Sequence, residues 1–547
     1  MAPKNWWRVS LFRGALWIVV IWTVGGAVSG AHAAVRSLIV LVADGAGVAH
    51  TTVARWVSPS RSLPVDAMKV FLVRTYGAES LVTDSAPAAT AFATGHKTSD
   101  KFVGVLPGPV TLPGIPPVPP ERQQKPVASV LEGAKLLGKA TGLVATSNVQ
   151  HATPAAYSAH WPDRNQYNEI AEQQVYQDLD VVFGGGRKYL RPVSQGGART
   201  DGEDLIQVLK DRGYAIVETR EEMLRTQAPK VWGLFAEDAM ERDLDRPVFA
   251  PREPSLAEMT AKAIDILSRH PNGFFLFVEG SQVDWASHGN DPVGVVTELL
   301  AFHDAVQVAL DYARNRDDTA VLVFSDHGNG GMSLGNASTD GTYSRMSYES
   351  VVAPLKKATL TAEGIARHIG DNRTESRLRE VLRRFWGLED VTAEEVARIQ
   401  GYRGPHLSNA IAPVMSVRSN IGWTTHGHTG EDIILYTYGL DMHAGTVENT
   451  DIAHACARGM GFRLEDVDAT LFRPAEEVAA QLGGRVSIDR SDPENPVLVI
   501  RKEEGGAVRF PFSKDLMITD ERTYRLMSPT VYAPHTGTVY LTLEKEP

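Results

Sequence analysis

The chain has 547 residues, of which 43% are hydrophobic and 22% are charged. This composition is that of a globular protein of roughly two to four domains, and it argues against a disordered chain or a coiled coil. The formal net charge of −11 argues against a sequence-independent grip on nucleic-acid phosphates, so no nucleic-acid partner is expected. Cys456 is the only cysteine, which excludes an intramolecular disulfide and a zinc site built from several thiolates.

The first 33 residues have the pattern of a secretory signal peptide. Lys4, Arg8 and Arg13 precede an apolar stretch from Ala15 to about Val28, and small residues then lead to Ala33. This order predicts cleavage after Ala33 and a periplasmic or secreted mature chain without a stable membrane span. The alternative is an uncleaved membrane anchor, but the stretch is short and interrupted by glycines.

Four short, nearly continuous apolar runs end in polar side chains. Such runs, separated by helical patterns such as PSLAEMTAKAIDILSRH, are typical of parallel strands that are covered on both faces. They predict an α/β fold, a three-layer sandwich around a mostly parallel central sheet. Because ligands bind outside the carboxyl ends of the strands in such sheets, we expect the polar ends to share one edge. The runs are SLIVLVADGAG ending at Asp44, ATGLVATSNVQHAT near His151, FFLFVEGSQVDWASHGN at Glu279 and AVLVFSDHGNGG at Asp326.

The stretch LVTDSAPAATAFATG places Asp84 and Ser85 between an apolar run and an Ala-rich segment with helical character. A serine at the start of a helix is most often an N-cap that satisfies backbone N–H groups. Taken alone, this stretch therefore predicts only a helix start.

Two further regions differ from the α/β pattern. Residues from about 330 to 425 show amphipathic helices and predict a helical cap insertion. Residues 463–547 combine a short helix with strands punctuated by Gly and Pro, and predict a separate small α+β module. This module weakly resembles the N-terminal-like domain of copper amine oxidases and of some bacterial envelope proteins, and we expect it to contact envelope or surface partners.

Several Asp and His residues have spacings that suit a metal. Asp284 and His288 are four residues apart, which on a helix places both on one face. Asp326-His327 follows an apolar run, and His428 lies in THGHTGEDIILYTYG. Each of these signals is weak alone, because an Asp and a His four apart are common on solvated helix faces.

In combination, these segments resemble the alkaline phosphatases over residues 37–462, and the predicted catalytic domain spans residues 34–462. The motifs that carry the resemblance occur in the chain order of that family, and they are ADGAG, TDSAPAATAFATG, HATPAAYSAHWPDR, VEGSQVDWASHGN, FSDHGNGG and HGHTGED. The resemblance implies that Ser85 is the nucleophile that becomes phosphorylated, that Arg164 clamps the phosphate and that Asp84 orients neighbouring groups. A helix N-terminus suits this role because it favours an anion.

The resemblance also implies three metal sites. Two would hold zinc and one magnesium, and two metals can stabilise the attacking and leaving oxygens of an in-line displacement. The implied ligands are Asp284, His288 and His428 for the first zinc, Asp44, Asp326, His327 and the Ser85 oxygen for the second, and Asp44, Thr153 and Glu279 for the magnesium.

Two positions depart from the enterobacterial pattern of this family, which has Asp and Lys where this chain has His151 and Trp285. An imidazole at the third site favours zinc or cobalt over magnesium. Trp285 removes a positive charge near the phosphate. His426 lies beside His428 in the sequence but does not match the family position.

The sequence thus predicts a metal-dependent hydrolase of small phosphate monoesters. A homodimer is the expectation from the family, although no residue decides it. A sulfatase is disfavoured, because Ala89 stands where its motif needs arginine. A phosphodiesterase of the same superfamily and a non-catalytic envelope scaffold are the alternatives.

Overall fold

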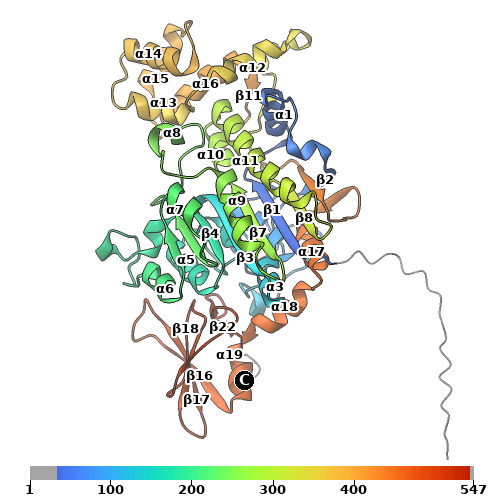
Figure 1. Cartoon of the computed structure of the whole chain (residues 1–547), viewed down its shortest axis with the longest axis vertical. Coiled ribbons are helices and arrows are strands. Elements are labelled where there is room, and N and C mark those ends of the chain that lie inside the picture. Colours follow the sequence, from blue (N-terminus) through green and yellow to red (C-terminus); the bar gives the residue numbers. More distant parts are fainter. Residues whose placement is uncertain (1–33, 543–547) are drawn as a thin grey trace, which may run out of the picture. The chain divides into compact units, whose positions relative to one another are not determined.

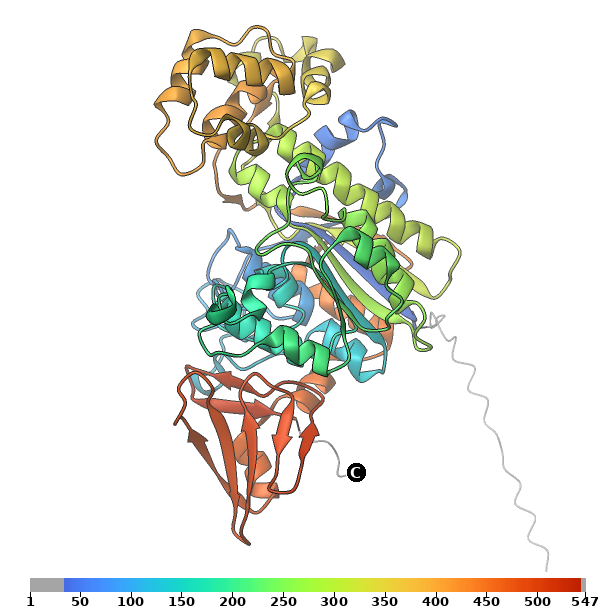
Figure 2. The ribbon, with the colours of Figure 1, turned by 60° about the vertical axis from the view of Figure 1, so that its left-hand side comes forward.

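A computed structural model describes residues 34–542, and the predicted signal peptide lies outside the described residues. The described chain is built around a ten-stranded sheet with helices on both faces (Figures 1 and 2). This arrangement confirms the predicted α/β class. In order across the sheet, the strands are β14 (Thr446–Glu448), β2 (Lys69–Arg74), β13 (Ile433–Tyr438), β8 (Thr319–Phe324), β1 (Ser37–Ala43), β7 (Phe274–Gly280), β3 (Ala140–Asn148), β4 (Val181–Gly185), β6 (Val231–Leu234) and β5 (Ala215–Val217).

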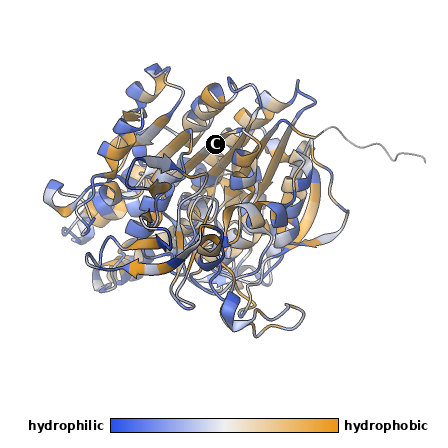
Figure 3. Ribbon diagram, turned by 90° about the horizontal axis from the view of Figure 1, so that it is seen from below, coloured by the Kyte–Doolittle hydropathy of each residue, from blue (hydrophilic) through white to orange (hydrophobic). Residues whose placement is uncertain are grey.

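The four predicted apolar runs form adjacent, parallel strands in the order β8, β1, β7, β3. Every residue of these strands is buried, as expected for strands covered on both faces. Figure 3 shows the central strands coloured as hydrophobic. In β1, Ile39 and Leu41 pack into the core on one face, while Leu38 and Val40 pack into the core on the other. The polar residues that follow these strands therefore reach the same sheet edge.

Each face of the sheet is covered by its own layer of helices. The helices on one face are α1 (Val48–Val57), α9 (Leu256–Leu267) and α11 (Pro292–Ala313). The helices on the opposite face are α2 (Ser85–Thr94), α3 (Val130–Leu136), α5 (Tyr167–Tyr176) and α17 (Asn449–Met460). Helix α9 starts with a capping box in which Ser255 and Glu258 satisfy each other's backbone N–H groups.

Strand β13 is the antiparallel member of the sheet. It pairs antiparallel with both β2 and β8, whereas the other strand pairs of this sheet are parallel. The chain thus returns from the cap and inserts β13 beside a strand formed about a hundred residues earlier (433 minus 324 gives 109). This return brings His428, which lies shortly before β13, to the carboxyl end of β8.

Helix α11 is the one helix within residues 34–542 that is long and apolar enough to span a membrane, and 67% of its apolar window is buried inside the fold. It packs against α9, α10 (Gln282–His288) and α1 as a core helix. Glu298 lies within it, and its carboxylate accepts a hydrogen bond of 2.7 Å from the backbone N–H of Asp243. Burial, with a smaller contribution from the charge of Asp243, raises the pKa of Glu298 to about 8.

The buried Glu298 predicts a specific pH dependence of stability. Its folded-state pKa lies above the unfolded-state value of about 4.3, so its stabilising proton is fully present below that value and is lost as pH rises through about 8. We expect Glu298→Gln to raise the Tm of the metal-loaded protein by a few degrees at pH 9 and by much less at pH 5. Thermal melts at both pH values test this, with exposed Glu389→Gln as the control. An equal change at both pH values would contradict the assignment.

The predicted cap consists of five helices. Helix α14 buries Leu378, Val381 and Leu382 as the sequence pattern indicates, and Trp386 beyond them is fully buried. Thr392 and Glu395 form a capping box at the start of another of these helices. The cap helices are α12 (Tyr348–Lys357), α13 (Ala362–Ile369), α14 (Glu375–Trp386), α15 (Ala393–Gly401) and α16 (Ser408–Arg418).

The C-terminal residues form small antiparallel sheets packed on α19 (Ala475–Gln481). This region thus contains the short helix and the strands that the sequence predicted. Lys514 contacts Glu172 at 3.2 Å and Asp515 contacts Arg212 at 2.5 Å, so buried ion pairs join this module to the catalytic region. The strands are β15 (Arg473–Pro474), β16 (Gly484–Asp489), β17 (Val497–Lys502), β18 (Ala507–Pro511), β19 (Leu516–Ile518), β20 (Thr523–Arg525), β21 (Val531–Ala533) and β22 (Thr538–Leu541).

Candidate active site

Polar side chains from the four central strands converge at the carboxyl edge of the sheet. Asp44 follows β1, Asp326 follows β8 and Glu279 lies near the end of β7, and all three are buried. Gly45 lets α10 approach, because its φ is +74° and a Cβ at this position would lie 2.7 Å from Asp284 Oδ1. Any larger residue at position 45 would therefore displace Asp284.

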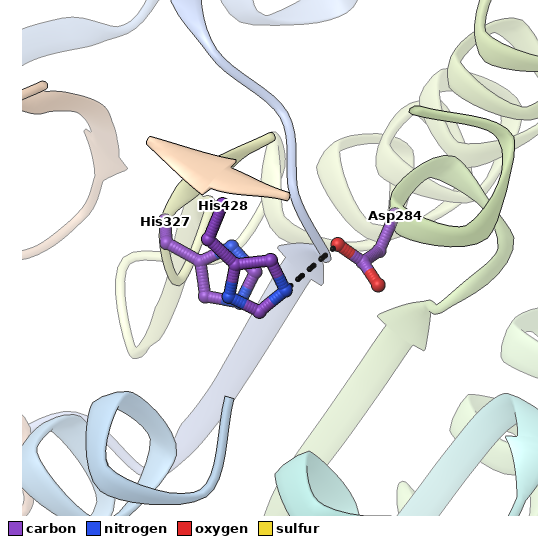
Figure 4. Close-up of side chains that lie close together, drawn as sticks. All are labelled: Asp284, His327 and His428. Atoms are coloured by element: carbon purple, nitrogen blue, oxygen red, sulfur yellow. Dashed lines mark ion pairs between the residues drawn. The ribbon is translucent and has the colours of Figure 1, made fainter. Parts of the chain in front are cut away.

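The predicted ligands of the first zinc lie together. His288 Nε2 is 3.3 Å from Asp284 Oδ2, and both residues project from α10. His428 Nε2 is 3.2 Å from His288 Nε2 and 3.6 Å from Asp284 Oδ1. Figure 4 shows that His428 also stacks on His327, with ring centroids 3.7 Å apart, so His327 lies between the first and second predicted sites.

The predicted ligands of the second zinc surround His327 and the serine. His327 Nε2 lies 3.2 Å from Asp326 Oδ2 and 3.6 Å from Asp44 Oδ1. The same nitrogen lies 3.1 Å from Ser85 Oγ. The hydroxyl that the sequence singled out is therefore in contact with a predicted metal ligand.

The third predicted site contains an additional histidine. Asp44, Glu279 and His151 offer ligand atoms within 4.8 Å of one another. His151 follows β3 and caps the short helix α4 (Ala152–Ala155), which carries Thr153. Burial, with a smaller contribution from the positive charge of Arg164, lowers the pKa of His151 to about 3, so this imidazole is neutral.

Several buried polar atoms in this region have no hydrogen-bond partner among the described residues. Such atoms are costly unless a ligand satisfies them. They are both carboxylate oxygens of Asp44, Thr153 Oγ1, Glu279 Oε1, Asp326 Oδ2 and His151 Nδ1. An array of converging carboxylate and hydroxyl oxygens, buried and negatively charged, fits divalent cations.

The close packing of the carboxylates also shifts their pKa values. Burial raises the pKa of Asp44 well above its usual value, and Asp326 contributes most among the neighbouring charges that raise it further. Burial raises the pKa of Glu279 to about 7, although a hydrogen bond from Ser281 opposes this shift. Burial and mutual repulsion therefore disfavour the charged forms of these carboxylates.

Ser85 is the first residue of α2, and Asp84 takes the N-cap position without bonding the helix through its side chain. The expectation of an ordinary serine N-cap is therefore wrong. The Asp84 carboxylate instead accepts a hydrogen bond of 2.5 Å from Arg164 Nη1, and Arg164 Nη2 donates to His151 Nε2 at 2.9 Å. Ser85 thus faces the cluster from the positive end of a ten-residue helix.

A cavity of about 460 Å³ opens in front of the serine. Ser85, Arg164 and Trp285 line it together with ligands of the first predicted site. Trp285 packs edge-on against His151, with ring centroids 5.7 Å apart. Every residue that the sequence singled out for the site lies in this cavity or in the buried cluster beside it.

Sequence reasoning missed the residues that orient the ligands. Asn329 is fully buried and donates a hydrogen bond of 2.6 Å to Asp284 Oδ1. His426 exchanges two hydrogen bonds with His288: His288 Nδ1 donates to the His426 carbonyl at 2.6 Å, and His426 Nδ1 donates to the His288 carbonyl at 2.9 Å. His426 is therefore a partner of the site. This role depends on hydrogen bonds to backbone carbonyl groups, and such bonds do not produce a recognisable spacing of residues in the sequence.

A buried cluster of this kind at the carboxyl edge of an α/β sheet, beside a serine and an arginine, defines a metal-binding hydrolase. A model of the alkaline phosphatase family matches residues 35–460. Alkaline phosphatase 3 of Bacillus subtilis (strain 168) is 35% identical over 452 residues, which cover 79% of this chain and 90% of the relative. The chain belongs to the alkaline phosphatase family, and it is a metal-dependent phosphate-monoester hydrolase.

Solved structures support the same conclusion. The crystal structure of Thermus thermophilus alkaline phosphatase is similar with a TM-score of 0.69 and 28% identity, covering 79% of this chain and 92% of that chain. Alkaline phosphatase from the Antarctic bacterium TAB5, with one histidine replaced by aspartate, is similar with a TM-score of 0.55 and 26% identity, covering 79% and 99%. That variant is described as having Mg bound in the M3 site.

Proposed function

We propose that the chain hydrolyses phosphate monoesters through a phosphoserine at Ser85, with two zinc ions and a third divalent cation. The contact that carries this proposal is the 3.1 Å approach of Ser85 Oγ to His327 Nε2, inside a cluster of unpartnered carboxylates. A serine hydroxyl is a weak nucleophile at its ordinary pKa and needs activation. This cluster is the activating group closest to it.

The residues present fit the cations. Bound zinc would lower the pKa of the serine and of water and would offset charge on the phosphoryl oxygens. The proposed ligands are Asp284, His288 and His428 for one zinc, Asp44, Asp326 and His327 for the other, and Asp44, Thr153, Glu279 and His151 for the third cation.

The remaining side chains of the site bind the phosphate or orient other residues. Arg164 has five N–H donors, of which single bonds to Asp84 and His151 use two, so the others are available to two phosphate oxygens. Asp84 holds the guanidinium in the cavity. His428 Nδ1 donates to the Thr83 carbonyl at 2.9 Å, which directs Nε2 toward Asp284.

Chelation tests the proposal directly. We expect exhaustive EDTA treatment of the purified mature chain to abolish release of phosphate from an aryl phosphate, and added zinc to restore it. Metal analysis of the purified protein should give about two to three divalent ions per chain. Activity that survives complete removal of metal would contradict the proposal.

The presence of His151 leads to a prediction about which cation the third site prefers. A neutral imidazole favours zinc or cobalt over magnesium, which prefers oxygen ligands. We expect His151→Asp to bind magnesium at the third site and to become magnesium-dependent, in line with the histidine-to-aspartate variant of the TAB5 enzyme. Metal content after dialysis against equimolar zinc and magnesium measures this, and His151→Asn, which lacks the charge, is the control. An unchanged metal ratio in His151→Asp would exclude His151 from the site.

The hydrogen bond from Asn329 to Asp284 leads to a prediction about the zinc affinity of the first site. Because its amide fixes the Asp284 carboxylate, we expect Asn329→Ala to weaken zinc binding by about 10–100-fold. Competition with a chromogenic chelator measures this affinity without relying on turnover. Asn329→Asp places two carboxylates in contact and should bind zinc with altered pH dependence, while exposed Asn372→Ala serves as a control. Equal affinity in Asn329→Ala and the native chain would show that Asp284 needs no support.

We also propose that the chain is exported, with its first 33 residues removed, and that residues 463–547 form a separate module that contacts envelope or surface partners. The N-terminal pattern supports the first statement and the composition change supports the second. N-terminal sequencing of the protein recovered from outside the cytoplasm tests the cleavage. A first residue other than Ala34 would contradict the predicted site.

A further inference from the structure

A larger cavity lies directly beside the active site, under the cap. Its volume is about 740 Å³, which is within the range of small-molecule pockets. We call it the cap groove. One wall comes from α10 and the turn after it, and the other from α13 and the segment that begins α16. The residues of the groove used below are Trp285, His288, Ala366, Leu407, Ser408 and Asn409.

The cap groove is continuous with the cavity that contains Ser85. Trp285 and His288 border both spaces. A phosphate ester that places its phosphoryl group between Ser85 and Arg164 therefore has room to extend past Trp285 and under the cap. The part of the substrate that would extend there is the alcohol, which is the leaving group.

We propose that the cap groove binds the leaving group, and that it favours uncharged, ring-bearing alcohols such as nucleosides over small polyols. This inference rests on the proposed function and names its preferred substrate class.

The charges in the groove are already compensated. Arg242 donates to Glu363 Oε2 at 2.8 Å and to the Gln282 carbonyl at 3.1 Å. Arg367 forms an ion pair with Glu241. Each arginine that lines the groove thus has a carboxylate partner within the described residues. A second phosphate or a carboxylate on the leaving group would therefore find both arginines of the groove already paired.

The uncompensated surface of the groove is aromatic, apolar and weakly polar. The indole of Trp285 is partly exposed and is held in place by the edge-on contact with His151. Ala366 and Leu407 add apolar surface, and Ser408 and Asn409 add a hydroxyl and an amide. Such a lining suits stacking of a planar ring and hydrogen bonds to its edge.

A second cavity, of about 510 Å³, lies on another side of Trp285. Its lining has two arginines, Arg242 and Arg367, and four carboxylates, whereas in the cap groove the same two arginines face two carboxylates. This excess of negative charge disfavours a ligand attached to a phosphate dianion. The cap groove is therefore the favoured direction for the leaving group.

Filling the groove from two positions, one in α13 and one at the start of α16, tests the inference. The metal-loaded enzyme and its variants Ser408→Trp and Ala366→Trp are assayed with adenosine 5′-monophosphate and with glycerol 2-phosphate. We expect each variant to raise the KM for the nucleotide by about tenfold, the order of one lost aromatic contact, and to change the KM for glycerol phosphate less than twofold. Ser376→Trp, exposed on α14 away from the groove, is the matched control and should change neither KM. Inhibition by free adenosine should weaken in the same two variants.

The outcomes separate the two proposals. Equal changes for both substrates, or no change for either, in two variants whose melting temperatures match the native enzyme would overturn the leaving-group site. If one variant does not fold, the other variant and adenosine inhibition of the native enzyme decide, and an absence of that inhibition would also overturn the site. A native enzyme that releases phosphate from neither ester would overturn the proposed function, and the leaving-group site with it.

Discussion

Ser85→Ala is expected to lower the turnover of an aryl phosphate by a factor on the order of 10⁴ or more, while the protein keeps its metal ions. The reason is geometric. Ser85 Oγ is the hydroxyl beside His327 and at the positive end of α2, and the substitution removes this oxygen but keeps the Asp, Glu, His and Thr side chains that are proposed to hold the cations. Single-turnover assays and metal analysis by mass spectrometry measure both quantities.

Trapping of the phosphorylated chain at acidic pH provides an independent measurement for the same variant. The native enzyme should incorporate phosphate at Ser85, and Ser85→Ala should incorporate none. Thr94→Val, which removes a buried hydroxyl at the other end of the same helix, is the control and should keep phosphate incorporation. A phosphorylated Ser85→Ala chain would place the nucleophile elsewhere.

Arg164→Ala is expected to lower kcat/KM for a phosphate monoester by about 10²–10³-fold. The guanidinium lies in the cavity with Ser85, and its contacts with Asp84 and His151 hold it there. A diester has one fewer charged oxygen for this clamp. We therefore expect the loss to be smaller for a bis-aryl diester than for the monoester.

Rates of Arg164→Ala and Arg164→Lys on both esters measure this difference. Lysine keeps the charge but not the planar fork, so it should recover only part of the monoester rate. An equal loss on monoester and diester would favour the phosphodiesterase alternative.

The sequence predicted the strands of the site because they are buried on both faces. Continuous apolar runs carry a strong signal, and their polar ends identified Asp44, Glu279 and Asp326. The family motifs then brought Ser85, Arg164 and the histidines into one hypothesis, and the structure places these residues together.

The remaining features depend on contacts that leave no local pattern. Strand β13 is short, and its antiparallel insertion between β2 and β8 is decided by the sheet and not by its own residues. The support that Asn329 gives to Asp284, and the exchange of bonds between His426 and His288, join residues 45 and 138 positions apart. The cap groove exists only because α13 and α16 lie opposite α10. The hydrophobic periodicity of a segment indicates which of its residues are buried, but it does not indicate which distant segments the segment contacts.

The late return of the chain in β13 has a consequence for biosynthesis. Asp44 and His428 are 384 positions apart (428 minus 44), and the short ribbon in which His428 pairs with Asn329 is completed only after the whole cap has been made. Closing so long a loop is entropically unfavourable until both ends pack. A nascent or truncated chain that stops before this ribbon holds the serine but lacks the proposed histidine ligand, so we expect it to hydrolyse phosphate esters only after this ribbon has formed.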